Sequence, residues 1–155
     1  MKNLFFVVSI LLALNLLNHT NACSVFVKGY TIHFKSDIQN EDVELRCQSK
    51  DDDIGHHVLN SSNPEMQWSF CSSYAGSTLY FCHFWRPSYD QHFDVFNTTM
   101  ISRCDQGKDE HNLCDWDIKD DGFYFFEPHN AVWVKSFNWN RKTSRKLISE
   151  YTLYP

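Results

Sequence analysis

The residues best suited to chemistry are three consecutive aspartates, Asp51–Asp53, which precede Ile54 and Gly55. Such a run could bind calcium or supply the paired carboxylates of a hydrolase. An EF-hand loop starting at Asp51 would need glycine at its sixth position and glutamate at its twelfth, but His56 and Ser62 stand there. Adjacent aspartates on an extended chain also point in diverging directions. We therefore interpret the stretch as a turn in which aspartates cap backbone N–H groups and Gly55 has a positive φ.

The histidines give no better candidate for catalysis or metal binding. His56 and His57 are neighbours, and on a strand neighbouring side chains face opposite ways, so one metal ion could not easily use both. His83 lies in an aromatic stretch, where we expect a packed or solvent-facing residue rather than a base. The sequence contains no GxSxG, HExxH, P-loop or Rossmann glycine pattern. We expect no catalytic residue, no metal and no cofactor, and thus a protein that is not an enzyme.

Six cysteines are present, an even number. In an oxidising compartment six cysteines predict disulfides, with 15 possible pairings. Zinc binding is the competing interpretation, but no CxxC pair occurs. The sequence therefore predicts a disulfide-stabilised domain whose connectivity is open at this point.

The first 22 residues have the pattern of a secretory signal peptide. Lys2 supplies a positive charge, Leu4–Leu17 is apolar, and Thr20 and Ala22 are the small residues expected before a cleavage site. The apolar run is too short for a spanning helix, which needs about 20 residues. We predict cleavage after Ala22, a secreted extracellular protein without membrane insertion, and one domain over residues 23–155.

Composition narrows the expected partners. The whole chain has a net charge of −5, so it lacks the basic surface of a nucleic-acid-binding protein. Asn60 and Asn97 each begin an N-x-S/T sequon and are expected to carry N-linked glycans on exposed loops or strand ends.

Alternation of apolar and polar residues dominates residues 30–139 and predicts strands with one buried face. Thr78–Trp85 and Gly122–Phe126 are apolar on both faces and should be central strands. Short polar connections favour a single antiparallel β-sandwich of about eight strands. The residues expected to point inward are Ile32, Phe34, Val43, Leu45, Trp68, Phe70, Phe93, Val95, Trp116 and Ile118.

Five segments, in order and at suitable spacing, carry a resemblance to a known family. They are VELRCQSKDDDIGHHVL, MQWSF, GSTLYFCHFW, FDVF and CDWDIKDDGFYFF, within residues 30–139. Together they resemble the plant self-incompatibility S-protein family, the S-protein homologues. The resemblance implies a small secreted glycoprotein, a β-sandwich with two disulfides and no known catalysis or cofactor.

The resemblance assigns the two disulfides to Cys47, Cys82, Cys104 and Cys114, which we predict to pair as Cys47–Cys114 and Cys82–Cys104. Cys23 and Cys71 depart from the family pattern and are candidates for a third bridge.

Family members that act in pollen rejection are ligands sensed by a pollen membrane protein. We therefore expect a monomeric recognition or signalling ligand for a cell-surface receptor, in self-incompatibility or a related developmental or defence role. The best candidates for contact are the polar stretches Ser36–Asp42 and Asp105–Asn112, then Asp51–Gly55.

The alternative is a secreted carbohydrate-binding module. Its evidence is the five tryptophans, since aromatic rings stack on sugars. They are Trp68, Trp85, Trp116, Trp133 and Trp139. Most lie at alternating strand positions, where core packing is the better interpretation.

Overall fold

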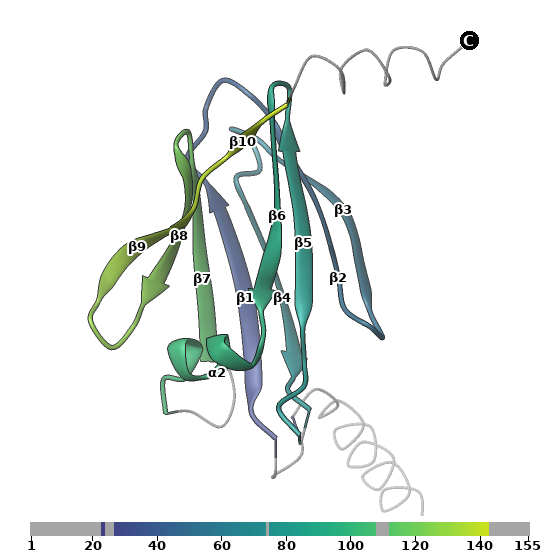
Figure 1. Ribbon diagram of the computed structural model, residues 1–155, viewed down its shortest axis with the longest axis vertical. Helices are drawn as coiled ribbons and strands as arrows, with labels where there is room; N and C mark the ends of the chain where they lie inside the picture. The colour runs from purple at the N-terminus through teal and green to yellow at the C-terminus, as the bar shows by residue number, and fades with distance from the viewer. Residues whose placement is uncertain (1–22, 24–26, 74, 108–111, 143–155) are drawn as a thin grey trace, which may run out of the picture.

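A computed structural model describes residues 23, 27–73, 75–107 and 112–142; the predicted signal peptide, residues 1–22, lies outside them. Within these residues two five-stranded sheets pack face to face (Figure 1). The strands are β1 (Gly29–Ser36), β2 (Val43–Gln48), β3 (Asp53–Leu59), β4 (Glu65–Cys71), β5 (Tyr80–Arg86), β6 (Tyr89–Phe96), β7 (Asn112–Lys119), β8 (Gly122–Glu127), β9 (Val132–Phe137) and β10 (Asn140–Arg141). The predicted all-β sandwich is confirmed.

Sheet A has the order β4-β1-β7-β8-β9, and sheet B the order β10-β6-β5-β2-β3. All described pairings are antiparallel except β1 with β7, which run parallel. The two strands expected to be central, β5 and β8, both have strand neighbours on each side. β4 and β9 are the edges of sheet A, and β3 is an edge of sheet B.

Most of the residues expected to point inward fill the layer between the sheets. Eight of the ten are buried: Ile32, Phe34, Val43, Leu45, Phe93, Val95, Trp116 and Ile118. Trp68 and Phe70 are only half-buried, although they pack against this core. Both lie on β4, which is an edge strand, so no further strand shields these two side chains on its outer side.

One short helix, α2 (Thr98–Cys104), was not expected from the sequence. Asn97 caps its N-terminus, because its Oδ1 accepts hydrogen bonds from the backbone N–H groups of Thr99 and Met100 at 3.0 and 3.3 Å. Only Met100 and Cys104 are buried, so seven residues present too little apolar periodicity to reveal a helix.

The predicted disulfide pairing is wrong. Cys47 pairs with Cys82 and Cys104 with Cys114, while Cys23 bonds to Cys71. Cys47 and Cys82 face each other across the β2–β5 pairing, with 4.1 Å between their Cα atoms. Cys114, the partner predicted for Cys47, lies in the opposite sheet and instead meets the end of α2.

Different interactions stabilise the two ends of the sandwich. All three disulfides lie toward the end that carries α2, as the direction of the strands in Figure 1 shows. At the other end the buried Arg86 donates hydrogen bonds to the carboxylates of Glu41 and Asp120, at 3.2 and 3.1 Å. Its guanidinium also lies over the rings of Tyr89 and Trp139. Glu41 lies between β1 and β2, Asp120 lies between β7 and β8, and Tyr89 begins β6. Arg86 therefore links connecting segments of both sheets at this end of the sandwich.

Candidate recognition surface

The aspartate run is split between a turn and a strand. Ser49 organises the turn, because its Oγ accepts from the backbone N–H groups of Asp51 and Asp52 at 3.2 and 2.9 Å. Asp53 begins β3, and its Oδ1 accepts from the Gly55 N–H at 2.9 Å. Gly55 has φ +88°, the positive value expected from the sequence, but it lies in β3 opposite Cys47, beside a register shift, rather than in the turn.

The three carboxylates do not form a catalytic pair. Asp53 binds the Arg46 guanidinium at 2.6 Å, which lowers the pKa of the carboxyl group. Asp52 accepts from the Tyr80 hydroxyl at 3.0 Å, and burial, with this hydrogen bond, raises the pKa of Tyr80 to about 12. Each of these two aspartates therefore has its own structural partner.

An open groove of about 860 Å³ lies beside this turn, bounded by the turn, the end of β4, Ser73 and residues 77–80. Its hydroxyl groups mostly bind one another or the backbone: the Ser73 Oγ lies 3.0 Å from the Ser77 Oγ and accepts from the Ser77 N–H at 2.8 Å, while the Thr78 Oγ1 accepts from the Ser73 N–H at 2.7 Å. These hydroxyl groups therefore already have partners within the loop that bounds the groove.

The neighbouring histidines face opposite ways, as strand geometry requires. His56 contacts the Glu44 carboxylate at 2.8 Å, whereas His57 contacts the Ile54 carbonyl oxygen at 3.0 Å. His83 faces outward from sheet B. Among the described residues no group of three His, Cys, Asp or Glu side chains is arranged to hold a metal ion.

An ionic cluster crosses the outer face of sheet A. His33 on β1 lies 2.6 Å from Asp115 on β7 and 3.7 Å from Glu65 on β4. The hydrogen bond to Asp115 raises the pKa of His33, against the opposing effect of burial. Protonation of His33 therefore strengthens contacts among three adjacent strands.

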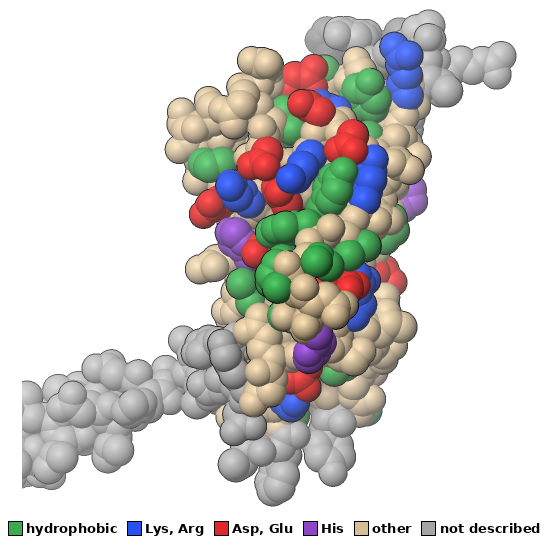
Figure 2. Space-filling model, turned by 90° about the vertical axis from the view of Figure 1, so that its left-hand side faces the viewer, with side chains coloured by type: hydrophobic (Ala, Val, Ile, Leu, Met, Phe, Trp, Pro, Cys, Tyr) green, Lys and Arg blue, Asp and Glu red, His purple; other side chains and the backbone are tan. Residues whose placement is uncertain are grey.

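The most exposed apolar surface lies on the edge strand β9. Val132, Trp133 and Val134 are 45, 42 and 37% exposed, and Leu79 is the fourth exposed large hydrophobic residue of the described chain. Val132 and Val134 lie on one face of the strand, and Trp133, whose ring centroid is 5.2 Å from that of Phe126, lies on the other. We call these three side chains, which flank the sheet edge on both faces, the β9 patch. The β8–β9 hairpin leans away from the sandwich in Figure 1, and Figure 2 shows hydrophobic side chains gathered on this side of the molecule beside charged ones. The patch combines apolar side chains with the free backbone edge of a sheet, which are the features of an interaction site.

The sequence did not identify this patch. The sequence interpretation favoured core packing for most of the five tryptophans, but Trp133 is exposed because β9 is an edge strand whose hairpin extends past the core. Trp116 and Trp139 are buried as expected, whereas Trp85 is half-buried and faces outward from β5. Whether a tryptophan is buried or exposed depends on where its strand lies in the sheet, and the sequence pattern does not give the strand order.

The two loops favoured for recognition lie at opposite ends of the sandwich. Ser36–Asp42 follows β1 at the Arg86 end; its Ile38 is buried, and its Glu41 binds Arg86. Asp105–Asn112 follows α2 at the disulfide end. The loops cannot form one continuous surface, because the length of the strands separates them.

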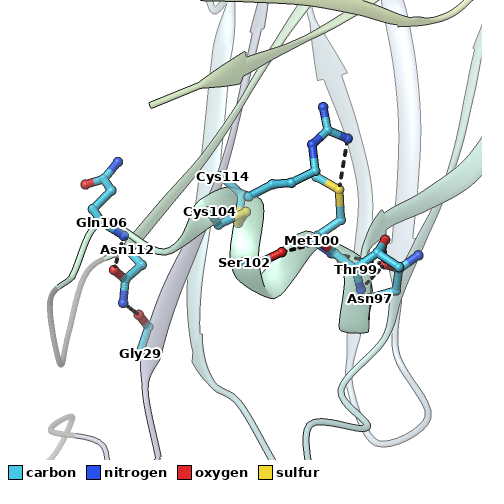
Figure 3. Close-up of a disulfide and its surroundings, with 10 residues drawn as sticks. Gly29, Asn97, Thr99, Met100, Ser102, Cys104, Gln106, Asn112 and Cys114 are labelled. Carbon is cyan, nitrogen blue, oxygen red and sulfur yellow. Dashed lines mark hydrogen bonds between the residues drawn. A yellow bond between two sulfur atoms is a disulfide. The ribbon is translucent and has the colours of Figure 1, made fainter. Parts of the chain in front are cut away.

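The loop Asp105–Asn112 is fixed at both ends (Figure 3). The Cys104–Cys114 disulfide closes it, and buried Asn112 bridges its base: its Oδ1 accepts from the Gln106 N–H at 2.9 Å and its Nδ2 donates to the Gly29 carbonyl at 3.1 Å. Asp105 forms an ion pair with Lys28 at 2.5 Å, which lowers the pKa of Asp105. Residues 108–111 lie outside the described chain.

Both sequon asparagines use their side-chain oxygen to shape the backbone. The Asn60 Oδ1 accepts from the N–H groups of Ser62 and Asn63 at 3.0 and 2.9 Å in the turn between β3 and β4. The Asn97 Oδ1 caps α2 and accepts from the Thr99 hydroxyl at 2.7 Å. Because a glycan attaches to the amide nitrogen, either oxygen could keep its role in a glycosylated chain.

Comparison with known proteins places this geometry in a family. The family model described as plant self-incompatibility protein S1 matches residues 31–139. S-protein homolog 2 of Arabidopsis thaliana is 32% identical over 114 residues, which cover 72% of this chain and 68% of that protein. S-protein homolog 3 of the same plant is 30% identical over 101 residues, which cover 63% of each chain.

A solved structure shares the fold at 13% identity, with a TM-score of 0.50 over 77% of this chain and all of the other. It is described as a self-incompatibility protein homologue from a widespread family of small, highly stable, secreted plant proteins. No helix among the described residues is long and apolar enough to cross a membrane. The matched family model, the sequence relatives and the shared sandwich together show that the chain belongs to the plant self-incompatibility protein S1 family.

Proposed function

We propose that the protein is a secreted, non-enzymatic ligand that binds a cell-surface receptor, in the rejection of self pollen or in a related developmental or defence signal. Residues 1–22 would direct secretion, and the processed chain would span residues 23–155. Glycans at Asn60 and Asn97 would lie at opposite ends of the sandwich. Family membership supports this role.

The β9 patch is the observation that carries the proposal. A small domain that exposes adjacent valine and tryptophan side chains on a sheet edge loses the free energy that their burial would give, about 25 cal/mol per Å². A receptor that adds an extended apolar segment along β9 would recover this energy and pair the free backbone groups. Trp133 is the expected anchor, because tryptophan is enriched among the residues that dominate binding energy.

The test compares two exposed apolar sites on one rigid scaffold. Trp133→Ser removes the central ring of the patch, and Leu79→Ser removes an equally exposed apolar side chain far along the chain from β9. Leu79→Ser should unfold within about 0.5 kcal/mol of the parent protein. Trp133→Ser also loses the contact between the Trp133 and Phe126 rings, whose centroids are 5.2 Å apart, and should cost about 0.5–1.5 kcal/mol more. Labelled proteins are then titrated onto plasma-membrane vesicles from plant reproductive and vegetative tissues.

Saturable, protease-sensitive binding that weakens at least about tenfold with Trp133→Ser and not with Leu79→Ser supports the proposal. Equal binding by all three proteins would exclude the β9 patch as the contact. Sedimentation measurements test whether a second copy of the chain binds the patch instead. Concentration-dependent dimers that are lost in Trp133→Ser would assign the patch to self-association.

A further inference from the structure

The outer face of sheet B has a shallow hollow over its middle strand, β5. Alternation along β5 turns Tyr80, Cys82 and Phe84 into the core, and it turns the residues between them outward, where they are half-buried. The hollow has a volume of about 400 Å³ and is lined by Arg46, Gln48, Phe81, His83 and Trp85. The hydrophobic core does not require rings at these outward positions, so they need a separate explanation.

The rings of this hollow belong to a continuous strip. His56 on β3 lies 5.5 Å from Trp85, Trp85 lies 5.0 Å from His83, and His83 lies 6.0 Å from His92 on β6. His92 lies 5.9 Å from Phe81. All are centroid distances, so five rings lie within contact range of one another across three strands. Their faces and edges form a surface suited to a ligand with an extended apolar side.

Hydrogen-bonding side chains border the strip on both sides. The strand register sets three rows across β2, β5 and β6: Glu44–Trp85–Asp90, Arg46–His83–His92 and Gln48–Phe81–Asp94. Adjacent strands are about 4.8 Å apart, and alternate residues of one strand about 6.7 Å apart. Each ring of β5 thus has a polar or charged side chain on either side, within reach of a group that lies on the ring.

We infer that this face binds a neutral oligosaccharide whose chain runs along β5. A pyranose unit has a C–H face that packs on an aromatic ring and a rim of hydroxyl groups that both donate and accept hydrogen bonds. Trp85 and Phe81 supply the stacking surfaces. Gln48 and the carboxylates of Glu44, Asp90 and Asp94 supply the complementary hydrogen-bonding groups. This site is separate from the β9 patch, which lies on the other sheet, and it does not depend on the receptor role.

The charges around the hollow specify a neutral ligand. Arg46 is the only Lys or Arg among the nine residues of the three rows, and it is paired with Asp53 at 2.6 Å. Three of the nine are carboxylates, and the chain as a whole has a net charge of −5. Nucleic acids, phosphorylated ligands and uronic-acid chains would be repelled, because like charges at close range cost binding energy.

Calorimetric titration of the intact, disulfide-bonded protein tests the inference. The probes are linear oligosaccharides of β-linked glucose, xylose or mannose, and a polygalacturonate fragment serves as the acidic probe. At least one neutral probe should bind saturably, and the acidic one should not. Trp85→Gln should weaken binding about tenfold, the size expected for loss of one stacked ring.

Two further variants secure the result. Gln48→Ala changes an exposed residue with no cost to folding and should also weaken binding, whereas Trp133→Ser, in the β9 patch, should leave it unchanged. No saturable binding of any neutral probe would overturn the inference. So would binding of the acidic probe alone, or an affinity that Trp85→Gln and Gln48→Ala both leave within about twofold of the parent value.

Discussion

Replacing Arg86 with methionine should lower the free energy of unfolding by about 2–3 kcal/mol. The side chain makes three hydrogen bonds, to Glu41, to the Asp120 carboxylate and, at 2.8 Å, to the Asp120 carbonyl oxygen. Bonds with charged partners contribute about 1.5–3 kcal/mol each in favourable cases. Contacts with the rings of Tyr89 and Trp139 add about 0.5–1 kcal/mol each.

The full sum is not expected, for two reasons visible in the structure. The side chains of Glu41 and Asp120 are 39 and 84% exposed, so water solvates both carboxylates once the guanidinium is gone. Among the described residues the buried Arg86 Nε has no hydrogen-bond partner, so its removal relieves a cost of about 1 kcal/mol or more. Methionine also keeps much of the packing against the two rings.

Denaturant unfolding of the intact protein measures the difference, and Arg46→Met is the matched control. Arg46 has the shorter ion pair, 2.6 Å to Asp53, but its side chain is 56% exposed, so the control should lose clearly less stability than Arg86→Met. Arg86→Lys should give an intermediate loss, because one ammonium group cannot replace the planar fork of donors. If Arg86→Met costs no more than Arg46→Met, burial does not set the strength of this contact and the reasoning fails.

Two other changes give distinct outcomes. Gly55→Val should cost about 1–3 kcal/mol of backbone strain. Gly122→Ala should destabilise the fold more. An added Cβ at Gly122 would lie 2.1 Å from the Phe137 carbonyl oxygen, whereas one at Gly55 meets no atom within 4 Å. Thermal unfolding ranks them, and a fully stable Gly55→Val protein would contradict the positive φ. His33→Gln should cost more stability at about pH 5 than at about pH 8. The pKa of His33 is higher in the folded protein than in the unfolded chain, so protonated His33 stabilises the fold. This stabilisation is complete below the ordinary pKa of histidine and is lost as the pH rises through the raised pKa. Denaturant unfolding at both pH values measures this, and a pH-independent loss would show that the contact with Asp115 does not depend on the charge of His33.

Alternation in the sequence was enough to predict the sandwich and most of its core. It finds which side chains share a face, but not which strands are neighbours. Trp68 on β4 therefore could not be recognised as an edge position, since it follows the same alternation as buried Trp116, and the apolar run Val132–Val134 gives no sign that β9 is an edge strand. The β9 patch was missed for this reason. Trp85 was named among rings that could stack on sugars, but the strip that it forms with rings of β3 and β6 depends on the strand order of sheet B.

The errors in the cysteine pairing have a similar origin. Cys47 and Cys82 meet because β2 and β5 are adjacent in a particular register, and no spacing in the sequence encodes that register. Local chemistry was more informative: the glycine after the aspartate run does have a positive φ. Its position in β3 instead of the turn depends on a bulge, which pairing with β2 produces.

Because disulfides stabilise one end of the sandwich and ion pairs of Arg86 the other, the two ends should respond to different changes in the medium. Covalent sulfur bonds hold the α2 end, so a change in redox conditions should loosen that end and leave the Arg86 end in place. The Arg86 end depends on ion pairs with exposed carboxylates, so salt and acid should weaken it while the sulfur bonds remain intact. In an oxidising extracellular medium the α2 end is effectively permanent. Near Arg86, where no disulfide lies among the described residues, ionic conditions outside the cell then act directly on the loop Ser36–Asp42 and its neighbours.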